Sequence, residues 1–329
     1  MADRPEAVLD DIAHSASLRW LEHMRNGEFE SAWQISDFLL HRRPAPAPPS
    51  LPRHLQWIWN GTPLNGRRVL IRCYHGLGDT IQFIRYVRQV RALAARVIVW
   101  CQPSLIPLLK GTDGIHELLP LHDGAPDVEY DVDVEVMELP FIFRTTMDSI
   151  PSEVPYITAR GNAGRTSDAR DRIHAGLVWK AGDWAPHRSL VFTQLAPLFE
   201  VPVEWHILQT GRGLQEWSPG TGRLADAHEP IATARAMRHL DLLITIDSMT
   251  AHLAGALAVP VWTLLPADAD WRWMRNRHDS PWYPTMRLFR QERQGDWDDV
   301  IRRVAEELRR VDAARSHPGD HLKPAEAPV

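Results

Sequence analysis

Short apolar runs alternate with amphipathic helical stretches along most of this chain, and the alternation occurs in two successive series. In the first series, residues 68–74 predict a strand, residues 79–95 a helix and residues 97–101 a second strand. The second series begins at residue 173. Strands that alternate with helices favour parallel sheets, and 329 residues are more than one compact core usually holds. We therefore expect an α/β protein with two Rossmann-like domains that face a cleft.

The rest of the chain divides around these two series. Further strands are expected at 115–119, 130–136, 173–180, 204–210, 242–247 and 261–265, and further helices at 193–199, 230–240, 248–258 and 298–311. The strand at 130–136 alternates in polarity, which suits a half-exposed edge. The expected parts are a helical hairpin with a proline-rich linker (1–52), a first domain (53–165), a second domain (166–312) and a disordered tail (313–329).

The hairpin spans residues 17–43 and resembles one degenerate tetratricopeptide unit. Its first helix is expected to bury a stripe formed by Leu18, Leu21 and Met24, and to end at Asn26-Gly27. One such unit cannot bury its own apolar face, so we expect it to pack on the next domain or on a protein partner, including a second copy.

Composition limits the class of protein. The net charge is -5, which argues against a general nucleic-acid partner. Cys73 and Cys101 both lie in or beside apolar runs, which indicates buried thiols and no disulfide framework. The sequence has neither a secretory signal pattern nor an apolar run long enough for a membrane helix. We expect a cytoplasmic protein, at most peripheral to the inner membrane.

The first chemical motif is a glycine loop between the strand at 68–74 and the following helix. It contains His75, Gly76, Gly78 and Asp79. A dinucleotide fingerprint needs a third glycine where Ile81 stands, and the Gly-Lys-Ser/Thr of a P-loop is missing. Asp79 has two interpretations: an N-cap of the helix, which the local sequence favours, or a general base at the edge of a cleft.

The second motif follows the expected strand at 242–247. Asp247 ends that strand, Ser248 stands where a helix cap is expected, and Thr250 and His252 follow on the helix. These side chains suit a phosphate or a ribose, because a helix N-terminus favours anions. A capped helix with a satisfied histidine explains the same residues, and the two interpretations are compatible.

Two loops supply further candidates. After the strand at 173–180 come Lys180, His187 and Arg188, cations that suit a diphosphate, although the local sequence favours a solvated loop. Trp179 and Gln209 are also donor-site candidates. The second loop, 268–284, is rich in tryptophan, and Trp271 is expected either to stack on a base or sugar or to plug the cleft. Asp268 and Asp270 in this loop mimic a metal-binding pair, but no supporting ligands are visible and no metal is expected.

Four segments together resemble bacterial glycosyltransferases of family 9, which contains the ADP-heptose–lipopolysaccharide heptosyltransferases. The segments are GLGDTIQFIRY, GLVWKAGDWAPHRSL, DLLITIDSMTAHLAGALAVPVWTLLP and DWRWMRNRHDSPWYPTMRLFRQ. The similarity covers residues 57–311 and is closer to the branch that is fused to tetratricopeptide repeats.

The resemblance implies a GT-B fold, with the acceptor held by the N-terminal half and the nucleotide sugar by the C-terminal half. It implies transfer with inversion and without a metal ion or another cofactor. On this pattern Asp79 matches the proposed catalytic base, Asp247 and His252 match donor-site residues, and Arg188 stands where the family has a phosphate-binding lysine. The chain departs from the pattern at His75, where many relatives have glutamine, and it lacks the cysteine cluster of the iron-containing autotransporter heptosyltransferases.

These observations predict a glycosyltransferase that uses a nucleoside-diphosphate sugar, with heptose from ADP-heptose as the default of the family. The acceptor is a hydroxyl of a glycan, a protein or a small molecule. The alternative is a non-catalytic module that binds a sugar nucleotide or a glycan. An oxidoreductase is a third interpretation, against which the missing glycine argues.

Overall fold

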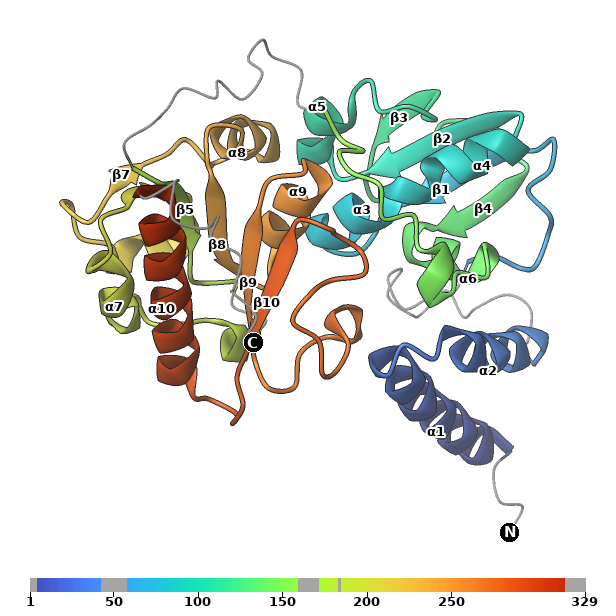
Figure 1. Cartoon of the computed structure of the whole chain (residues 1–329). Coiled ribbons are helices and arrows are strands. Elements are labelled where there is room, and N and C mark those ends of the chain that lie inside the picture. The colour runs from blue at the N-terminus through green and yellow to red at the C-terminus, as the bar shows by residue number, and fades with distance from the viewer. Residues whose placement is uncertain (1–4, 43–57, 159–171, 183–184, 317–329) are drawn as a thin grey trace, which may run out of the picture.

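The computed structural model describes residues 5–42, 58–158, 172–182 and 185–316. Two parallel sheets lie side by side (Figure 1). The first has the order β3-β2-β1-β4, with β1 (Arg68–Arg72), β2 (Arg96–Cys101), β3 (Glu117–Pro120) and β4 (Val132–Glu135). The second has the order β10-β9-β8-β5-β6-β7, with β5 (His174–Val178), β6 (Glu204–Ile207), β7 (Arg223–Leu224), β8 (Leu242–Ile246), β9 (Val261–Leu265) and β10 (Met286–Arg290). The predicted α/β fold with two Rossmann-like sheets is confirmed, and β4 is an edge strand as expected.

Helices cover these sheets and connect their strands. They are α1 (Pro5–Arg25), α2 (Phe29–His41), α3 (Leu77–Phe83), α4 (Val87–Leu93), α5 (Ile106–Leu109), α6 (Leu139–Ile142), α7 (Ala196–Phe199), α8 (Pro230–Met237), α9 (Met249–Ala256) and α10 (Trp297–Ser316). None of the helices in the described ranges is both long enough and apolar enough to span a bilayer. Cys73 and Cys101 are buried free thiols, as predicted.

Several boundaries differ from the predictions. The helix expected at 79–95 begins at Leu77 and is interrupted by a 3-10 turn, Ile84–Tyr86. The sequence analysis missed β10, and α10 continues beyond the domain limit placed at residue 312. The end of the predicted proline-rich linker (residues 43–52), the boundary predicted between the two domains (within 159–171) and residues 317–329 of the predicted tail lie outside the described residues.

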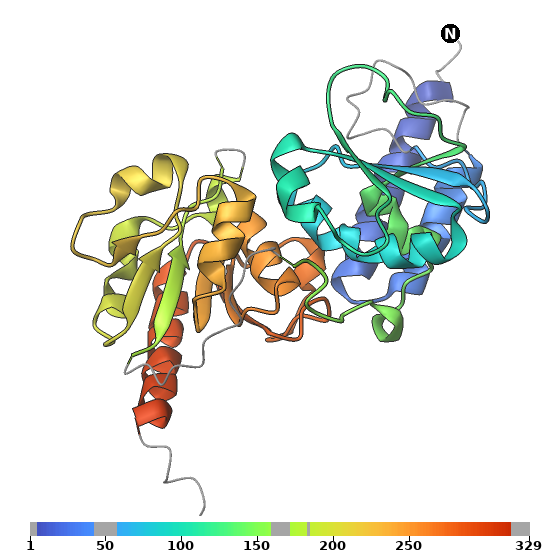
Figure 2. The same cartoon turned by 90° about the horizontal axis from the view of Figure 1, so that it is seen from above.

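The two halves pack directly against each other through α3 and α9 (Figure 2). A Cβ atom at Gly78 would lie 2.8 Å from the His252 ring and 3.5 Å from the Met249 Cα, so only glycine allows this approach. The buried apolar residues of the first domain continue into those of α8, α9 and the tryptophan-rich loop as one cluster. A shared core of this kind fixes the glycine loop of the first domain beside the helix N-terminus of the second.

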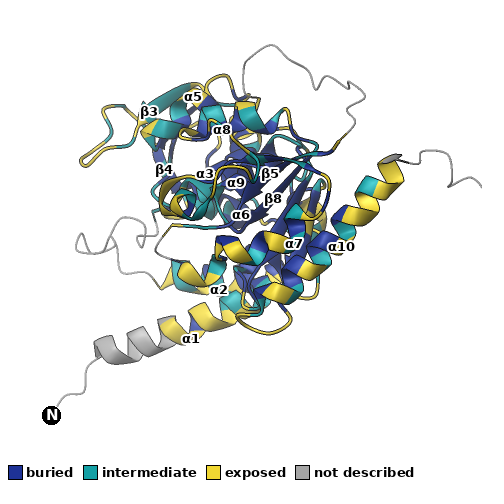
Figure 3. Ribbon diagram, turned by 90° about the vertical axis from the view of Figure 1, so that its left-hand side faces the viewer, coloured by how far each residue is buried: buried dark blue, intermediate teal, exposed yellow. Residues whose placement is uncertain are grey.

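The hairpin packs on its own chain. The Trp33 indole N–H donates to the Thr145 carbonyl at 2.6 Å, and the Trp20 ring meets the Trp271 ring edge-on with centroids 5.5 Å apart. The predicted apolar stripe is wrong at Leu18, which is 56% exposed, because α1 turns Trp20 toward the body of the protein. Figure 3 shows the exposed outer faces of α1 and α2.

Candidate functional site

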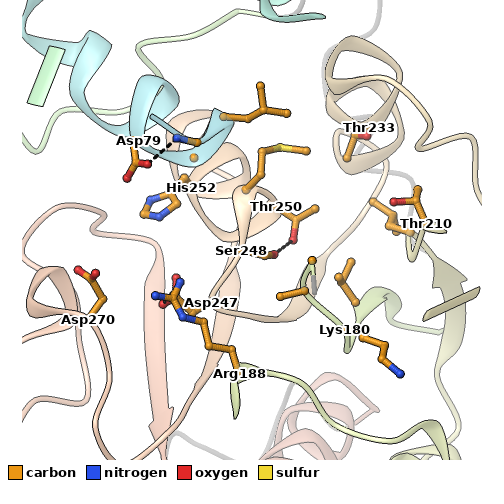
Figure 4. Close-up of a pocket in the computed structure, with 18 of the residues that line it drawn as sticks. Asp79, Lys180, Arg188, Thr210, Thr233, Asp247, Ser248, Thr250, His252 and Asp270 are labelled. Atoms are coloured by element: carbon orange, nitrogen blue, oxygen red, sulfur yellow. Dashed lines mark hydrogen bonds and ion pairs between the residues drawn. The ribbon is translucent and has the colours of Figure 1, made fainter. Parts of the chain in front are cut away.

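A cavity of about 420 Å³ lies where the carboxyl ends of the strands of both sheets meet (Figure 4). Its volume is in the range of small-molecule sites. Of the predicted site residues, those that line it are His75, Gly76, Gly78, Asp79, Lys180, Arg188, Gln209, Asp247, Ser248, Thr250 and His252. Residues from both halves of the chain therefore share one cavity, as the pattern of motifs predicted.

Asp79 is fixed by two contacts of its carboxylate. It occupies the third position of α3, and its Oδ2 accepts the N–H of Gly76, the N-cap residue, at 2.8 Å. The prediction that Asp79 is the N-cap is therefore wrong, because the helix begins two residues earlier than expected. Its Oδ1 accepts a hydrogen bond from the Arg272 guanidinium, which comes from the other half of the chain. Asp79 thus has a defined orientation at the boundary between the two domains.

Arg272 is the principal site residue that the sequence analysis missed. Its side chain is 10% exposed, lines the cavity and lies 2.8 Å from the Asp270 carboxylate as well as beside Asp79. Burial lowers the pKa of Arg272, but the negative charges of Asp270, Asp79 and Asp247 outweigh burial and raise it above its ordinary value. Arg272 is therefore a permanent cation in the cavity wall.

Asp247 and Arg188 form the second charged pair. Asp247 follows β8 and is buried, and its Oδ2 lies 3.1 Å from an Arg188 guanidinium nitrogen (Figure 4). Burial raises the pKa of Asp247, and the positive charge of Arg188 opposes that rise. The structure brings together the two donor-site candidates from different loops, which the sequence alone did not place in contact.

The N-terminus of α9 opens into the cavity. Ser248 is the N-cap residue, but its side chain makes no capping hydrogen bond, contrary to the expectation that it caps the helix. Instead its hydroxyl is 2.8 Å from the Thr250 hydroxyl, which is 2.7 Å from that of Thr245. The Ala251 N–H donates to the Ser248 carbonyl at 3.1 Å. The N–H groups of Met249 and Thr250 receive no cap from the Ser248 side chain, so they suit an anion.

His252 is a buried, neutral member of the site. Its Nδ1 hydrogen-bonds with the Tyr283 hydroxyl at 3.0 Å, and its ring stacks on Trp273 with centroids 5.2 Å apart. Burial, together with Arg272, Arg85 and Arg188, lowers the pKa of His252 well below 6.5. At neutral pH His252 therefore contributes a hydrogen bond rather than a charge.

A second buried carboxyl lies in the first domain. Glu135, at the end of β4, has an oxygen 3.6 Å from the His75 Nε2. Burial raises the pKa of Glu135 well above 4.5, and the nearby carboxylates Glu138 and Asp79 raise it further, while the Met137 N–H lowers it. Glu135 was not predicted from the sequence, because a lone glutamate at the end of an edge strand belongs to no motif.

The remaining candidates have structural partners. Lys180 lines the cavity, but its ammonium is bound by Glu216. Gln209 accepts the N–H groups of Trp179 and Lys180 at 3.0 and 2.9 Å, so it braces the ends of β5 and β6. Trp179 is buried away from the cavity and His187 is exposed outside it, so these two donor-site predictions are not supported.

The tryptophan-rich loop fills the space between the domains. Trp271 does not line the cavity; it packs between Trp20 and Phe83, and Arg272 enters the cavity in its place. This placement agrees with the loop as a plug of the cleft, and stacking of Trp271 on a ligand stays a prediction. Asp268 and Asp270 lie beside Arg25 and Arg272, at 2.9 and 2.8 Å, so arginines already neutralise this predicted metal-like pair.

Comparison with known proteins identifies the fold. No family model matches the chain. It is 25% identical over 291 residues to Protein FlbA of Caulobacter vibrioides, covering 76% of this chain and 48% of FlbA, so it spans about half the length of that relative. A family 9 glycosyltransferase from Veillonella parvula and the ADP-heptose lipopolysaccharide heptosyltransferase II of E. coli each match 76% of this chain and 99% of their own, at 14% identity and TM-score 0.53. The fold is that of the family 9 glycosyltransferases.

A third structure with this fold is the iron-containing, dodecameric glycosyltransferase TibC of enterotoxigenic E. coli. It matches 78% of both chains at 12% identity and TM-score 0.52. The resemblance to family 9 that the sequence predicted therefore holds for the fold, which includes both sheets. Fusion to further tetratricopeptide repeats stays a prediction.

Proposed function

We propose that this protein is an inverting glycosyltransferase that moves a sugar from a nucleoside-diphosphate sugar to an acceptor hydroxyl. The observation that carries the proposal is the shared cavity, in which Asp79 of one half faces Arg188, Asp247 and the N-terminus of α9 in the other. A carboxylate base opposite an anion-binding helix end is the combination that such a transfer needs. The family 9 fold supports the same reaction class.

In this mechanism Asp79 is the general base. An acceptor hydroxyl is a weak nucleophile until a base in reach takes its proton. The acceptor oxygen forms a bond to the anomeric carbon, its proton passes to the Asp79 carboxylate, and the bond between the anomeric carbon and the phosphate oxygen breaks. The electron pair of that bond leaves with the nucleoside diphosphate. Because the acceptor oxygen attacks the face of the sugar opposite the leaving group, the configuration at the sugar carbon inverts.

The donor side stabilises the leaving group. Negative charge grows on the diphosphate as the bond breaks, and the first-turn N–H groups of α9 together with Arg188 and Arg272 supply the compensating positive charge. This arrangement needs no metal ion for the chemical step. Asp247 suits a hydroxyl of the nucleotide or sugar, and neutral His252 adds a hydrogen bond. We take ADP-heptose as the first donor to test, because the resemblance points to it.

A donor panel tests the proposal. The full chain is incubated with ADP-, GDP-, UDP- and CMP-sugars and, separately, with NAD. Binding is measured by calorimetry, and sugar transfer or hydrolysis by mass spectrometry, with and without EDTA. We expect one nucleoside-diphosphate class to bind and to be turned over equally in EDTA. Binding without turnover for any donor and acceptor would favour the non-catalytic binding module, and binding of NAD alone would favour an oxidoreductase.

Two variants test the donor site. Arg188→Ala and His252→Ala are each expected to weaken binding of the nucleoside diphosphate by about 1–3 kcal/mol, the usual cost of a charge-assisted hydrogen bond. Arg212→Ala, an exposed arginine outside the cavity, serves as the matched control. Unchanged affinity in both folded variants would refute the assignment of the donor side.

A further inference from the structure

Three metal-ligating side chains meet at the amino ends of β5 and β6, outside the cavity. The parallel register pairs His174 with Glu204 and Gly176 with His206. Paired residues, and residues two apart on a strand, point to the same face of a sheet. His174, Glu204 and His206 therefore share one face, and the glycine opposite His206 adds no side chain between them.

The distances suit one small cation. One ligand atom from each of the three residues lies within 4.8 Å of the others. The His174 Nδ1 is 3.0 Å from the His206 Nε2, while a Glu204 carboxylate oxygen lies 3.8 Å from the other nitrogen of that ring, Nε2. One imidazole gives an ion only one nitrogen, so the ion takes a single ligand atom from each residue, and such a set lies within 4.8 Å. Two imidazole nitrogens that bind the same zinc ion at 2.0–2.1 Å are about 3.3 Å apart in tetrahedral geometry. The two rings need to separate by only a few tenths of an ångström, and all three residues are half-buried, so an ion can reach them.

The charged groups around the cluster are also defined. Arg223 lies 3.2 Å from the other oxygen of Glu204, but its side chain is 77% exposed and can move into solvent. The Asp241 carboxylate accepts the backbone N–H of His174 at 3.0 Å, and the Arg315 guanidinium lies 3.2 Å from the same oxygen and balances its charge. A metal ion binds the unprotonated nitrogen of each imidazole and so replaces the direct contact between the two rings.

We propose that His174, Glu204 and His206 bind a transition-metal ion such as Zn²⁺, with water completing the coordination. Two imidazoles and one carboxylate suit zinc, whereas Mg²⁺ and Ca²⁺ prefer oxygen ligands alone. The site lies roughly 20 Å along β5 from Lys180 in the cavity, at a rise of about 3.3 Å per residue. Its effect is to join β5 to β6 and stabilise the second domain, and the site is independent of the proposed transfer reaction.

Titration with Zn²⁺ alone tests the site. The full chain is stripped with EDTA, returned to chelator-free buffer and titrated by calorimetry. We expect one equivalent to bind, and His174→Ala or His206→Ala to weaken that binding at least about tenfold. Glu204→Gln, which keeps the shape of the side chain, is expected to weaken it as well. His122→Ala is the matched control, since His122 is an exposed histidine on the other domain.

Thermal unfolding provides the second measurement. Saturating Zn²⁺ is expected to raise the Tm of the wild type and of His122→Ala, but not that of the His174 and His206 variants, because a ligand stabilises only a fold that binds it. ADP affinity in the same samples is expected to stay unchanged by EDTA. Absence of Zn²⁺ binding to the wild type, or equal binding by all variants, would overturn the proposal.

Discussion

Replacement of Arg272 tests how the two domains share the site. Arg272 is a buried cation held between Asp79 and Asp270, and its guanidinium also lies 5.5 Å from the Phe83 ring centroid. Arg272→Met removes the charge and keeps most of the apolar volume, whereas Arg272→Lys keeps the charge without the planar fork of donors. The two variants therefore separate the charge of Arg272 from its geometry.

The loss of stability can be worked from the contacts. Breaking a fully buried ion pair costs about 3–5 kcal/mol. The side chains of Asp79 and Asp270 are 23% and 21% exposed, so water can partly solvate them once the arginine is gone. We expect Arg272→Met to lose about 2–3 kcal/mol. For a chain of this size that loss corresponds to a fall in Tm of about 4–6 °C.

The effect on transfer is expected to be larger than the effect on stability. If Arg272 both orients Asp79 and meets the leaving diphosphate, Arg272→Met lowers kcat by about 10²–10³, and Arg272→Lys recovers part of that loss. The assay is turnover of the donor identified by the panel, with Tm measured on the same preparations. Arg275→Met is the control, because Arg275 lies in the same loop and pairs with exposed Glu22, so its loss is expected to cost less than about 1 kcal/mol and no activity. A folded Arg272→Met variant with normal kcat would refute the reasoning.

Three further predictions concern separate parts of the chain. Asp79→Asn is expected to abolish transfer and leave nucleotide affinity nearly unchanged, measured by turnover and calorimetry; wild-type turnover would reduce Asp79 to a structural residue. The pKa of Glu135 is higher in the folded protein than in the unfolded chain, so the folded protein favours the protonated carboxyl. The free energy of unfolding that this contributes is fully present below the unfolded pKa and is lost as pH rises through the folded pKa. Glu135→Gln should therefore flatten the fall of Tm as pH rises above the ordinary pKa of glutamate, and equal slopes would contradict this. Trp33→Ala should lower the free energy of unfolding by about 3–5 kcal/mol, measured by thermal or denaturant unfolding. Leu18→Ala, on the exposed face of α1, should leave it nearly unchanged. Similar losses in both variants would show that the hairpin is not held through Trp33.

The sequence predicted those helices and strands that a pattern of consecutive residues identifies. The strand at 261–265 is found as expected, and β8 followed by α9 brings Asp247 and His252 into one site because a strand, a tight turn and a helix are consecutive in the chain. The edge strand β10 was missed because its five residues include two arginines and follow a proline-containing loop, so neither alternation nor an apolar run marks it.

Contacts between distant segments were harder to predict. The loop Trp271–Trp273 alternates tryptophan and arginine, and which of the three side chains enters the cavity depends on the 3-10 turn and on the packing of Trp271 against the hairpin. No local sequence pattern predicts that Trp271 contacts Trp20, which lies about 250 residues earlier in the chain. The same reason explains why the histidines of β5 and β6 gave no signal: their proximity arises from the register of two strands rather than from spacing.

The ion pairs in the cavity bear on how a nucleotide would bind. Each arginine already lies beside a carboxylate, Arg188 beside Asp247 and Arg272 beside Asp79 and Asp270. A diphosphate therefore gains less from these cations than it would from free arginines, since it competes with fixed carboxylates for the same donors. In return the guanidinium groups are held in position before the ligand arrives, which lowers the entropic cost of ordering them. Much of the affinity must then come from the N–H groups at the start of α9, for which the Ser248 hydroxyl does not compete, so binding should depend more on the phosphates than on the base.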